Sequence, residues 1–171
     1  MFTTRTTTRV GIGYDVHAIT EKETFVLGGI HIPFEKEGKK MGLLAHSDGD
    51  VLTHAIIDAL LGAAALGDIG DHFPDTDMTY HNIDSLELLL KAEGLIRKIG
   101  YDIVNIDATI IAQAPKLFEH KQAIKKKIAK TLKIFPDQVN IKATTNEYLG
   151  SLGKGLGIAV HAVCLIEREG K

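Results

Sequence analysis

An aspartate and a histidine stand two residues apart in the segment GIGYDVHAI. Residues at positions i and i+2 of a β-strand point to the same face, so Asp15 and His17 can converge on one object. A third residue, His54, lies in a segment with helical spacing and has Asp50 and Asp58 four residues to either side. A carboxylate neighbour orients a histidine that binds a metal through its other ring nitrogen. We therefore predict a metal site at Asp15, His17 and His54.

The donor types at this site indicate zinc with an open position. Two histidines and one carboxylate leave the fourth position of a tetrahedral zinc ion free, which is typical of catalysis or of phosphate binding. Structural zinc sites prefer thiolates, and the chain has a single cysteine, Cys164. The alternative interpretation is a turn-forming aspartate beside a surface histidine.

Two further motifs fail their spacing tests. The segment HSDGD lacks the D-x-D-x-D-G spacing of a calcium loop, and GIGYDV lacks the last glycine of a dinucleotide-binding G-x-G-x-x-G. Asp48 and Asp50 are instead typical of the first turn of a helix, which favours acidic residues. His46 comes just before this turn, in a place where anions bind readily.

The segment KATTNEYLG ends a predicted strand with hydroxyl groups and a carboxylate. Glu147 is a hard oxygen ligand of the kind that suits magnesium or manganese when phosphates are near. Thr144 and Thr145 are also common in strands for their β-propensity alone. The segment DHFPDTD lies in a long polar loop, where turn chemistry and a functional loop are equal alternatives.

Size and composition limit the class of protein. The chain has 171 residues, which predicts a single domain over 1–171 with 1–8 as a flexible lead-in. A net charge of −2 gives no electrostatic case for nucleic acid or an anionic membrane, and the lysine-rich segment 116–133 reads as an amphipathic helix with a solvated face. No apolar run reaches the ~18 residues of a membrane span. The lone cysteine fits a reducing compartment, so we expect a cytoplasmic protein.

The elements that must position these residues follow from hydrophobic periodicity. We predict strands at 10–14, 25–27, 30–34, 103–111, 139–143 and 158–166, and a charged loop at 35–42. Helices are predicted from HSDGD, with a capping-box-like start at Ser47 and Asp50, to about Gly67; from Asp84 or Ser85 to about Lys98; and from Pro115. This order predicts an α+β fold, a mixed β-sheet with helices packed on one face in a two-layer sandwich with ferredoxin-like βαβ elements.

Several motifs together resemble one enzyme family. YDVH, GLLAHSDGDVLTHAIIDALLGAAALGDIGDHFPDTD, TIIAQAPK and IKATTNEYLG are similar to 2-C-methyl-D-erythritol 2,4-cyclodiphosphate synthases, in order and in spacing, from Val10 to about Arg168. The resemblance implies an enzyme of non-mevalonate isoprenoid biosynthesis. In this reaction the 2-phosphate of 4-diphosphocytidyl-2-C-methyl-D-erythritol 2-phosphate attacks the β-phosphorus, a cyclic diphosphate forms and CMP leaves. It also implies a homotrimer with an active site at each subunit junction.

The resemblance further implies roles for individual residues. It assigns zinc binding to Asp15, His17 and His54, and binding of magnesium or manganese to Glu147. It assigns stabilisation of the transition state to His46 and Thr145. The implied substrate-binding residues are Ser47, Asp68, Ile69, Gly70, Phe73, Pro74, Asp75, Thr76, Asp77, Ala112, Gln113, Ala114, Pro115, Lys116, Leu117, Phe118, Thr144, Asn146, Ser151 and Lys154.

This chain departs from the family pattern after the KATTNE motif. Ser151 and Lys154 replace a phenylalanine and an arginine near a central cavity that can hold isoprenoid diphosphates, and Asn146 replaces a threonine. Lysine keeps the positive charge but loses the bidentate fork of arginine. Two rival functions stay open: a zinc hydrolase of nucleotide diphosphates, with zinc-bound water as nucleophile, and a non-enzymatic metal-binding or ligand-sensing trimer.

Overall fold

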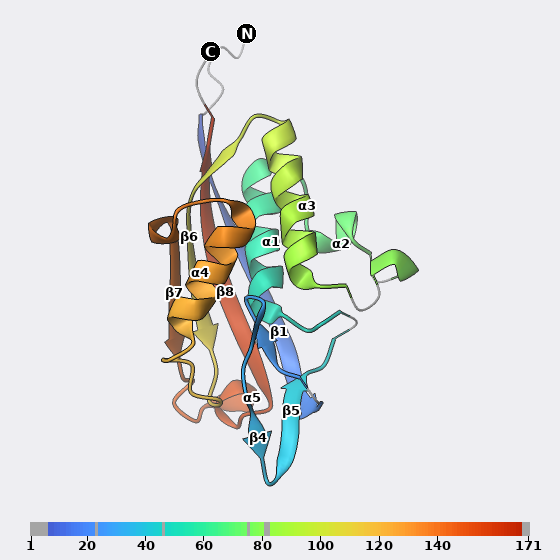
Figure 1. Cartoon of the computed structure of the whole chain (residues 1–171), viewed down its shortest axis with the longest axis vertical. Helices are drawn as coiled ribbons and strands as arrows, with labels where there is room; N and C mark the ends of the chain where they lie inside the picture. The colour runs from blue at the N-terminus through green and yellow to red at the C-terminus, as the bar shows by residue number, and fades with distance from the viewer. Residues whose placement is uncertain (1–6, 23, 46, 75, 81–82, 169–171) are drawn as a thin grey trace.

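The computed structural model describes residues 7–22, 24–45, 47–74, 76–80 and 83–168 (Figure 1). In chain order its elements are β1 (Thr8–Glu21), β2 (Val26–Leu27), β3 (Ile30–His31), β4 (Glu35–Lys36), β5 (Lys39–Leu43), α1 (Val51–Ala64), α2 (Ile69–His72), the 3-10 helix η1 (Met78–Tyr80), α3 (Ser85–Lys98), β6 (Asp102–Ile111), α4 (Lys121–Leu132), the 3-10 helix η2 (Pro136–Gln138), β7 (Val139–Thr144), α5 (Gly150–Gly153) and β8 (Gly157–Glu167).

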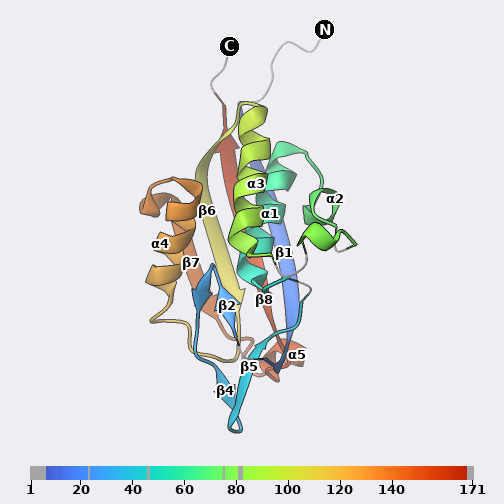
Figure 2. The same ribbon diagram turned by 45° about the vertical axis from the view of Figure 1, so that its right-hand side comes forward.

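The described strands form a six-stranded sheet in the order β4-β5-β1-β8-β6-β7, with β2 and β3 as a separate ribbon. β1 pairs antiparallel with β8 from Thr8 to Ala18, whereas β6 pairs parallel with β7. The parallel pair needs a crossover, which α4 supplies. Helices α1, α3 and α4 lie over one face of the sheet (Figures 1 and 2). The predicted α+β fold with a mixed sheet is confirmed.

Two glycines of β1 let helix α1 lie unusually close to the sheet. A Cβ atom added at Gly11 would lie 2.1 Å from the carbonyl oxygen of Ala59, and one at Gly13 would lie 1.9 Å from that of Ala55. The helix presents small residues at this contact, since Ala55, Ala59 and Ala63 are spaced by four. The close approach sets the distance between the side chains of β1 and those of α1.

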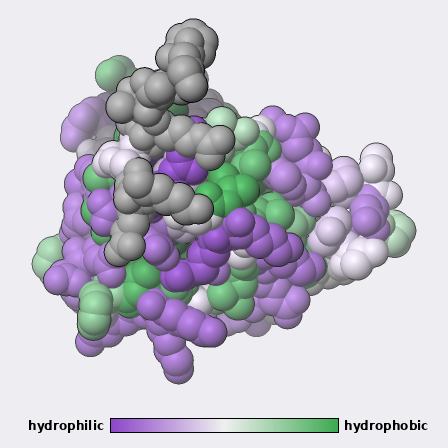
Figure 3. All heavy atoms as spheres, turned by 90° about the horizontal axis from the view of Figure 1, so that it is seen from above, coloured by the Kyte–Doolittle hydropathy of each residue, from purple (hydrophilic) through white to green (hydrophobic). Residues whose placement is uncertain are grey.

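The core fills the space between the sheet and its helices. α1 contributes fully buried Leu52, Ile56 and Leu60, and burying such a side chain stabilises the fold by about 1.5–3 kcal/mol. α4 contributes Ile124 and Ile128 from the four-residue repeat that the sequence shows. Seen from the end where β1 begins and β8 ends, hydrophilic residues cover much of the surface, with hydrophobic patches between them (Figure 3). None of the described helices is long and apolar enough to cross a membrane.

The face of β1 that points away from α1 is apolar and exposed. Val10, Ile12, Tyr14 and Val16 alternate along the strand with the helix-facing residues and are 66%, 69%, 51% and 47% exposed. Val163 of β8 pairs with Ile12 and is 40% exposed. No described helix of this chain covers these side chains.

Two predicted elements are wrong. The charged segment 35–42 was expected to be a loop, but it contains β4 and most of β5, which pair as an antiparallel hairpin. The third helix was expected from Pro115, but α4 begins at Lys121, and Pro115 follows a cis peptide bond. Proline favours turns as well as helix starts, and the core-facing repeat begins only at Ile124, so the helix needs no earlier start.

Other boundaries differ by less. β1 extends the predicted strand at both ends. Helix α1 is capped by Asp50 alone, whose side chain accepts from the backbone N–H of Thr53, and it ends at Ala64 because Ala65 takes a left-handed conformation. Helix α3 begins after Asp84 and ends at Lys98, as predicted.

Candidate metal and substrate site

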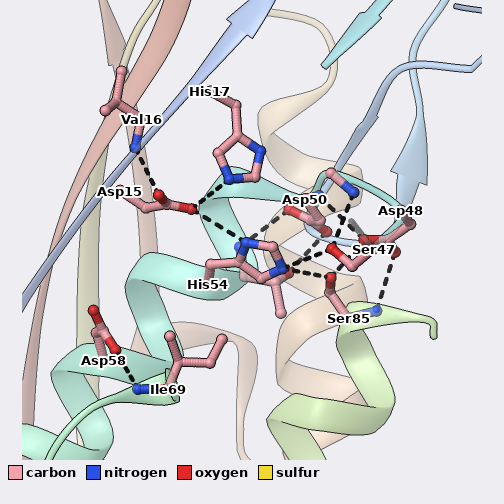
Figure 4. Close-up of polar contacts among 12 residues, drawn as sticks. Asp15, Val16, His17, Ser47, Asp48, Asp50, His54, Asp58, Ile69 and Ser85 are labelled. Carbon is pink, nitrogen blue, oxygen red and sulfur yellow. Dashed lines mark hydrogen bonds and ion pairs between the residues drawn. The ribbon is translucent and has the colours of Figure 1, made fainter. Parts of the chain in front are cut away.

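Asp15, His17 and His54 converge as the sequence predicts. Asp15 and His17 share one face of β1, and His54 reaches them from the first turn of α1 (Figure 4). Asp15 Oδ2 lies 3.0 Å from His17 Nε2 and 3.2 Å from His54 Nδ1. One ligand atom from each residue lies within 4.8 Å of the others, so the three side chains can hold one metal ion.

The chemistry of this donor set fits zinc. The side chains of His17 and His54 are only 13% and 12% exposed, and that of Asp15 is 26% exposed. His17 Nδ1 is buried and has no hydrogen-bond partner among the described residues. Two imidazoles and one carboxylate are ligands that zinc takes in open sites.

The electrostatics of the cluster are governed by Asp15. Burial raises the pKa of the Asp15 carboxyl, but hydrogen bonds and charge interactions with His17 and His54 outweigh burial and hold this pKa well below its usual range. Burial lowers the pKa of His54, whereas Asp15 and the charges of Asp50 and Asp48 raise it more. Asp15 is therefore ionised at neutral pH, as a metal ligand must be.

The cluster opens into a cavity of about 380 Å³. Ser47, Ile69, Gly70 and Phe73 also line this cavity, so four of the residues predicted to bind substrate lie next to the metal cluster. α2 carries Ile69 and Gly70, and Asp68 caps it.

Asp58 fixes α2 beside the cluster. It lies one turn after His54, and its Oδ1 accepts a 2.8 Å hydrogen bond from the backbone N–H of Ile69 (Figure 4). Burial, followed by the nearby charges of Asp68 and Asp15, raises the pKa of Asp58. The sequence places Asp58 on the stripe of His54, but its contact with Ile69 has no signal in the spacing.

Asp50 and Asp48 tie neighbouring elements to the start of α1. Asp50 is fully buried and accepts hydrogen bonds from the backbone N–H groups of Gly28, Gly29 and Thr53 and from the Thr53 hydroxyl. Burial raises the pKa of Asp50 in spite of these bonds. Asp48 accepts from both the N–H and the hydroxyl of Ser85, the first residue of α3. Sequence patterns identify Ser85 only as a candidate helix cap and do not predict its contact with Asp48.

A second group of predicted residues lies where β6 and β7 end. The backbone N–H of Ala112 donates to Thr144 O at 2.9 Å, which joins the segment 112–118 to the segment 144–147. Thr145 Oγ1 donates to Glu147 Oε1 at 3.2 Å. Among the described residues that line the 380 Å³ cavity, none belongs to either segment.

The remaining predicted residues are scattered or lie outside the description. Pro74, Thr76 and Asp77 are exposed. Ser151 lies in α5 and Lys154 directly follows this helix, and both residues are exposed. His46 and Asp75 lie outside the described residues.

Comparison with known proteins decides the family. The sequence model of the YgbB family matches residues 8–167. The chain belongs to the YgbB family. Its relatives include 2-C-methyl-D-erythritol 2,4-cyclodiphosphate synthases from Clostridium botulinum, 57% identical over 159 residues that make up 93% of this chain and 99% of that protein, and from Clostridium perfringens, 55% identical over 92% of this chain and 98% of that protein. The resemblance predicted from the motifs is confirmed.

Solved structures of YgbB-family relatives share the fold. IspF of Plasmodium falciparum in complex with CDP has a TM-score of 0.82 and 36% identity, over 98% of this chain and 100% of that chain. The bifunctional IspDF from Campylobacter jejuni has a TM-score of 0.89 and 45% identity, over 95% of this chain. This chain spans 42% of that longer protein.

Proposed function

We propose that this chain converts 4-diphosphocytidyl-2-C-methyl-D-erythritol 2-phosphate to 2-C-methyl-D-erythritol 2,4-cyclodiphosphate and CMP in non-mevalonate isoprenoid biosynthesis. It is a phosphorus–oxygen lyase of the YgbB family, and its Clostridium relatives carry the name of this synthase. The observation that carries the proposal is the cluster of Asp15, His17 and His54 in the wall of a cavity that predicted substrate-binding residues also line. CDP, which is present in the Plasmodium falciparum relative, shares its cytidine diphosphate portion with the substrate.

The metal-binding roles follow from the donor types. Asp15, His17 and His54 would hold zinc, and Glu147 would hold magnesium or manganese together with the substrate phosphates. Bound divalent ions neutralise phosphate charge and polarise phosphoryl oxygens. Ionised Asp15 supports the zinc assignment, because a carboxylate must lose its proton to bind a metal.

The other residues hold the substrate in line for ring closure. Ser47, Ile69 and Gly70 line the cavity and would bind the erythritol portion with its 2-phosphate. The segments 112–118 and 144–147 would bind the cytidine nucleotide. His46 and Thr145 would stabilise the charge that develops as one phosphate attacks another, a step that Coulomb repulsion opposes.

We propose a homotrimer whose active sites lie between subunits. The cavity lining of one chain lacks both segments assigned to the nucleotide, so a neighbouring chain can supply them. The exposed apolar face of β1, with Ile12 at 69% and Tyr14 at 51%, supports burial against other copies. Equilibrium sedimentation tests this assembly, and a monomer at micromolar concentration would contradict it.

Turnover in oxygen-18 water tests the reaction. The nucleophile is an oxygen already on the substrate, and well-oriented intramolecular attack can reach effective molarities of about 10⁵–10⁸ M. Mass spectrometry should therefore find no label in CMP or in the cyclic diphosphate. Label entering either product in step with turnover would establish the rival zinc hydrolase, which uses water as nucleophile.

A further inference from the structure

The second ring nitrogen of His54 points away from the metal cluster into a buried polar contact. His54 Nδ1 faces Asp15, whereas His54 Nε2 lies 2.9 Å from Ser85 Oγ (Figure 4). Ser85 is fully buried. It lies 31 residues after His54 in the chain, so the contact depends on the packing of α1 against α3. Ser47 Oγ is a more distant neighbour of the same nitrogen, at 3.2 Å.

The hydrogen on the Ser85 hydroxyl is already committed to another residue. Ser85 Oγ donates to Asp48 Oδ1 at 2.5 Å, and the backbone N–H of Ser85 donates to Asp48 Oδ2 at 3.0 Å. Asp48 Oδ1 also accepts from the backbone N–H of Asp50 at 3.1 Å. Three donors thus converge on the Asp48 carboxylate, which acts as an acceptor only. A serine hydroxyl has one hydrogen, so the Ser85 oxygen can only accept from His54.

The directions of these hydrogen bonds determine the tautomer of the His54 imidazole. His54 must carry a hydrogen on Nε2 to donate to Ser85, and its Nδ1 is then the nitrogen left to bind a metal as a neutral imidazole. The Nδ1 atom is also the one that faces Asp15 and His17. The direction of the hydrogen-bond chain and the position of the cluster therefore select the same nitrogen.

We propose that Ser85 and Asp48 are positioning residues for the metal site. They hold the His54 ring in the Nε2–H tautomer, with Nδ1 presented to the metal that Asp15 and His17 share. The proposal rests on the proposed zinc site. It gives α3 a role, because Ser85, the first residue of α3, orients His54, a metal ligand on α1. Partners of this kind typically change metal affinity by about 10–100-fold when they are removed.

Ser47 cannot replace Ser85 in this role. Its oxygen lies farther from His54 Nε2 and also accepts the backbone N–H of Gly49 at 3.3 Å. The structure shows no hydrogen bond from the Ser47 hydroxyl to a carboxylate among the described residues. Within the described part of the chain its hydrogen is not committed to another residue, so Ser47 does not dictate which nitrogen of His54 is protonated.

Zinc affinity of the full-length protein tests the proposal, with a matched control. Ser85→Ala removes the acceptor of His54, and Thr53→Val removes a different buried hydroxyl, one that donates to Asp50 Oδ2 at 2.8 Å. Both variants lose a buried hydroxyl-to-carboxylate hydrogen bond, but only the Ser85 hydroxyl contacts the ring of His54. In competition with a chromophoric chelator, we expect zinc binding to weaken about 10–100-fold in Ser85→Ala and less than about threefold in Thr53→Val.

Asp48→Asn provides a second variant, which keeps the Ser85 oxygen but replaces its charged partner with a neutral amide. We expect zinc binding intermediate between Thr53→Val and Ser85→Ala. Long-range imidazole ¹⁵N–¹H spectra of the zinc-loaded wild type should show a protonated Nε2 on His54. Ser85→Ala with the zinc affinity of Thr53→Val, or a His54 that binds zinc through Nε2, would overturn the proposal. A wild-type protein that binds no zinc would instead refute the proposed metal site itself.

Discussion

Gly13→Ala should open the contact between β1 and α1 that places His54 beside Asp15. A Cβ at Gly13 would lie 1.9 Å from the carbonyl oxygen of Ala55 and 2.8 Å from the backbone nitrogen of Ala59. Real Cβ contacts essentially never fall below 3.0 Å, so strand and helix must separate locally by about 1 Å. Both obstructing atoms belong to the helix backbone, and no side-chain rotation can relieve the overlap.

The expected cost follows from this geometry. Overpacking typically costs about 1–3 kcal/mol, and a backbone obstruction belongs at the upper end. For a chain of this length each kcal/mol lowers Tm by about 2–4 °C, so we expect Gly13→Ala to melt about 6–12 °C lower. His54 precedes Ala55 and should move with it, whereas metal–ligand distances tolerate only about 0.2 Å. Zinc affinity should therefore fall together with stability.

Calorimetry and zinc titration measure both effects, and Gly94→Ala is the matched control. Gly94 lies in α3, and a Cβ there meets no atom within 4 Å. Alanine favours a helix interior over glycine by about 1 kcal/mol, so this control should keep or raise Tm and should bind zinc normally. A Gly13→Ala protein with wild-type Tm and zinc affinity would refute the idea that the glycine contact builds the site.

Three further substitutions separate metal binding from folding. His17→Ala should abolish stoichiometric zinc while circular dichroism stays native, and full zinc occupancy by elemental analysis would contradict the assignment. Glu147→Gln should lower activity and weaken the response to added magnesium or manganese but retain zinc, because a neutral amide is a poorer ligand for a hard cation; wild-type metal response would give Glu147 another role. Asp50→Ala should lower the free energy of unfolding by about 3–5 kcal/mol in guanidinium titration, since it removes a helix cap and leaves N–H groups of Gly28 and Gly29 without their acceptor; a loss below about 1 kcal/mol would contradict this account.

The metal cluster could be predicted because its signals are local. Asp15 and His17 share a face through the two-residue period of a strand. The buried stripe of α4 was predictable for the same reason, since Ile124 and Ile128 repeat every four residues. The expectation that an acidic neighbour at helical spacing orients His54 is wrong, because Asp50 bonds to Gly28, Gly29 and Thr53 and Asp58 bonds to Ile69. The second ring nitrogen of His54 contacts Ser85 instead.

The exposed part of the β4–β5 hairpin gave no such signal, since only the end of β5, at Gly42 and Leu43, is buried. The β4–β5 hairpin carries exposed Glu35, Lys36, Lys39 and Lys40, so its pattern resembles that of a charged loop. The contact of Ser85 with His54 joins two helices and depends on how they pack, which spacing along the chain does not reveal.

Residues of β1 alternate between two faces of the strand, and each face has its own role. Gly11, Gly13, Asp15 and His17 meet α1 or the metal cluster, and the residues between them form the exposed apolar row. Substitutions on the outer row leave the inner row in place, but a one-residue deletion between Gly13 and Asp15 would exchange the two rows for the rest of the strand. The outer row should therefore tolerate exchanges among apolar residue types, whereas the strand should reject changes of length. Natural variation in chain length then belongs outside this stretch, in turns such as that between β4 and β5.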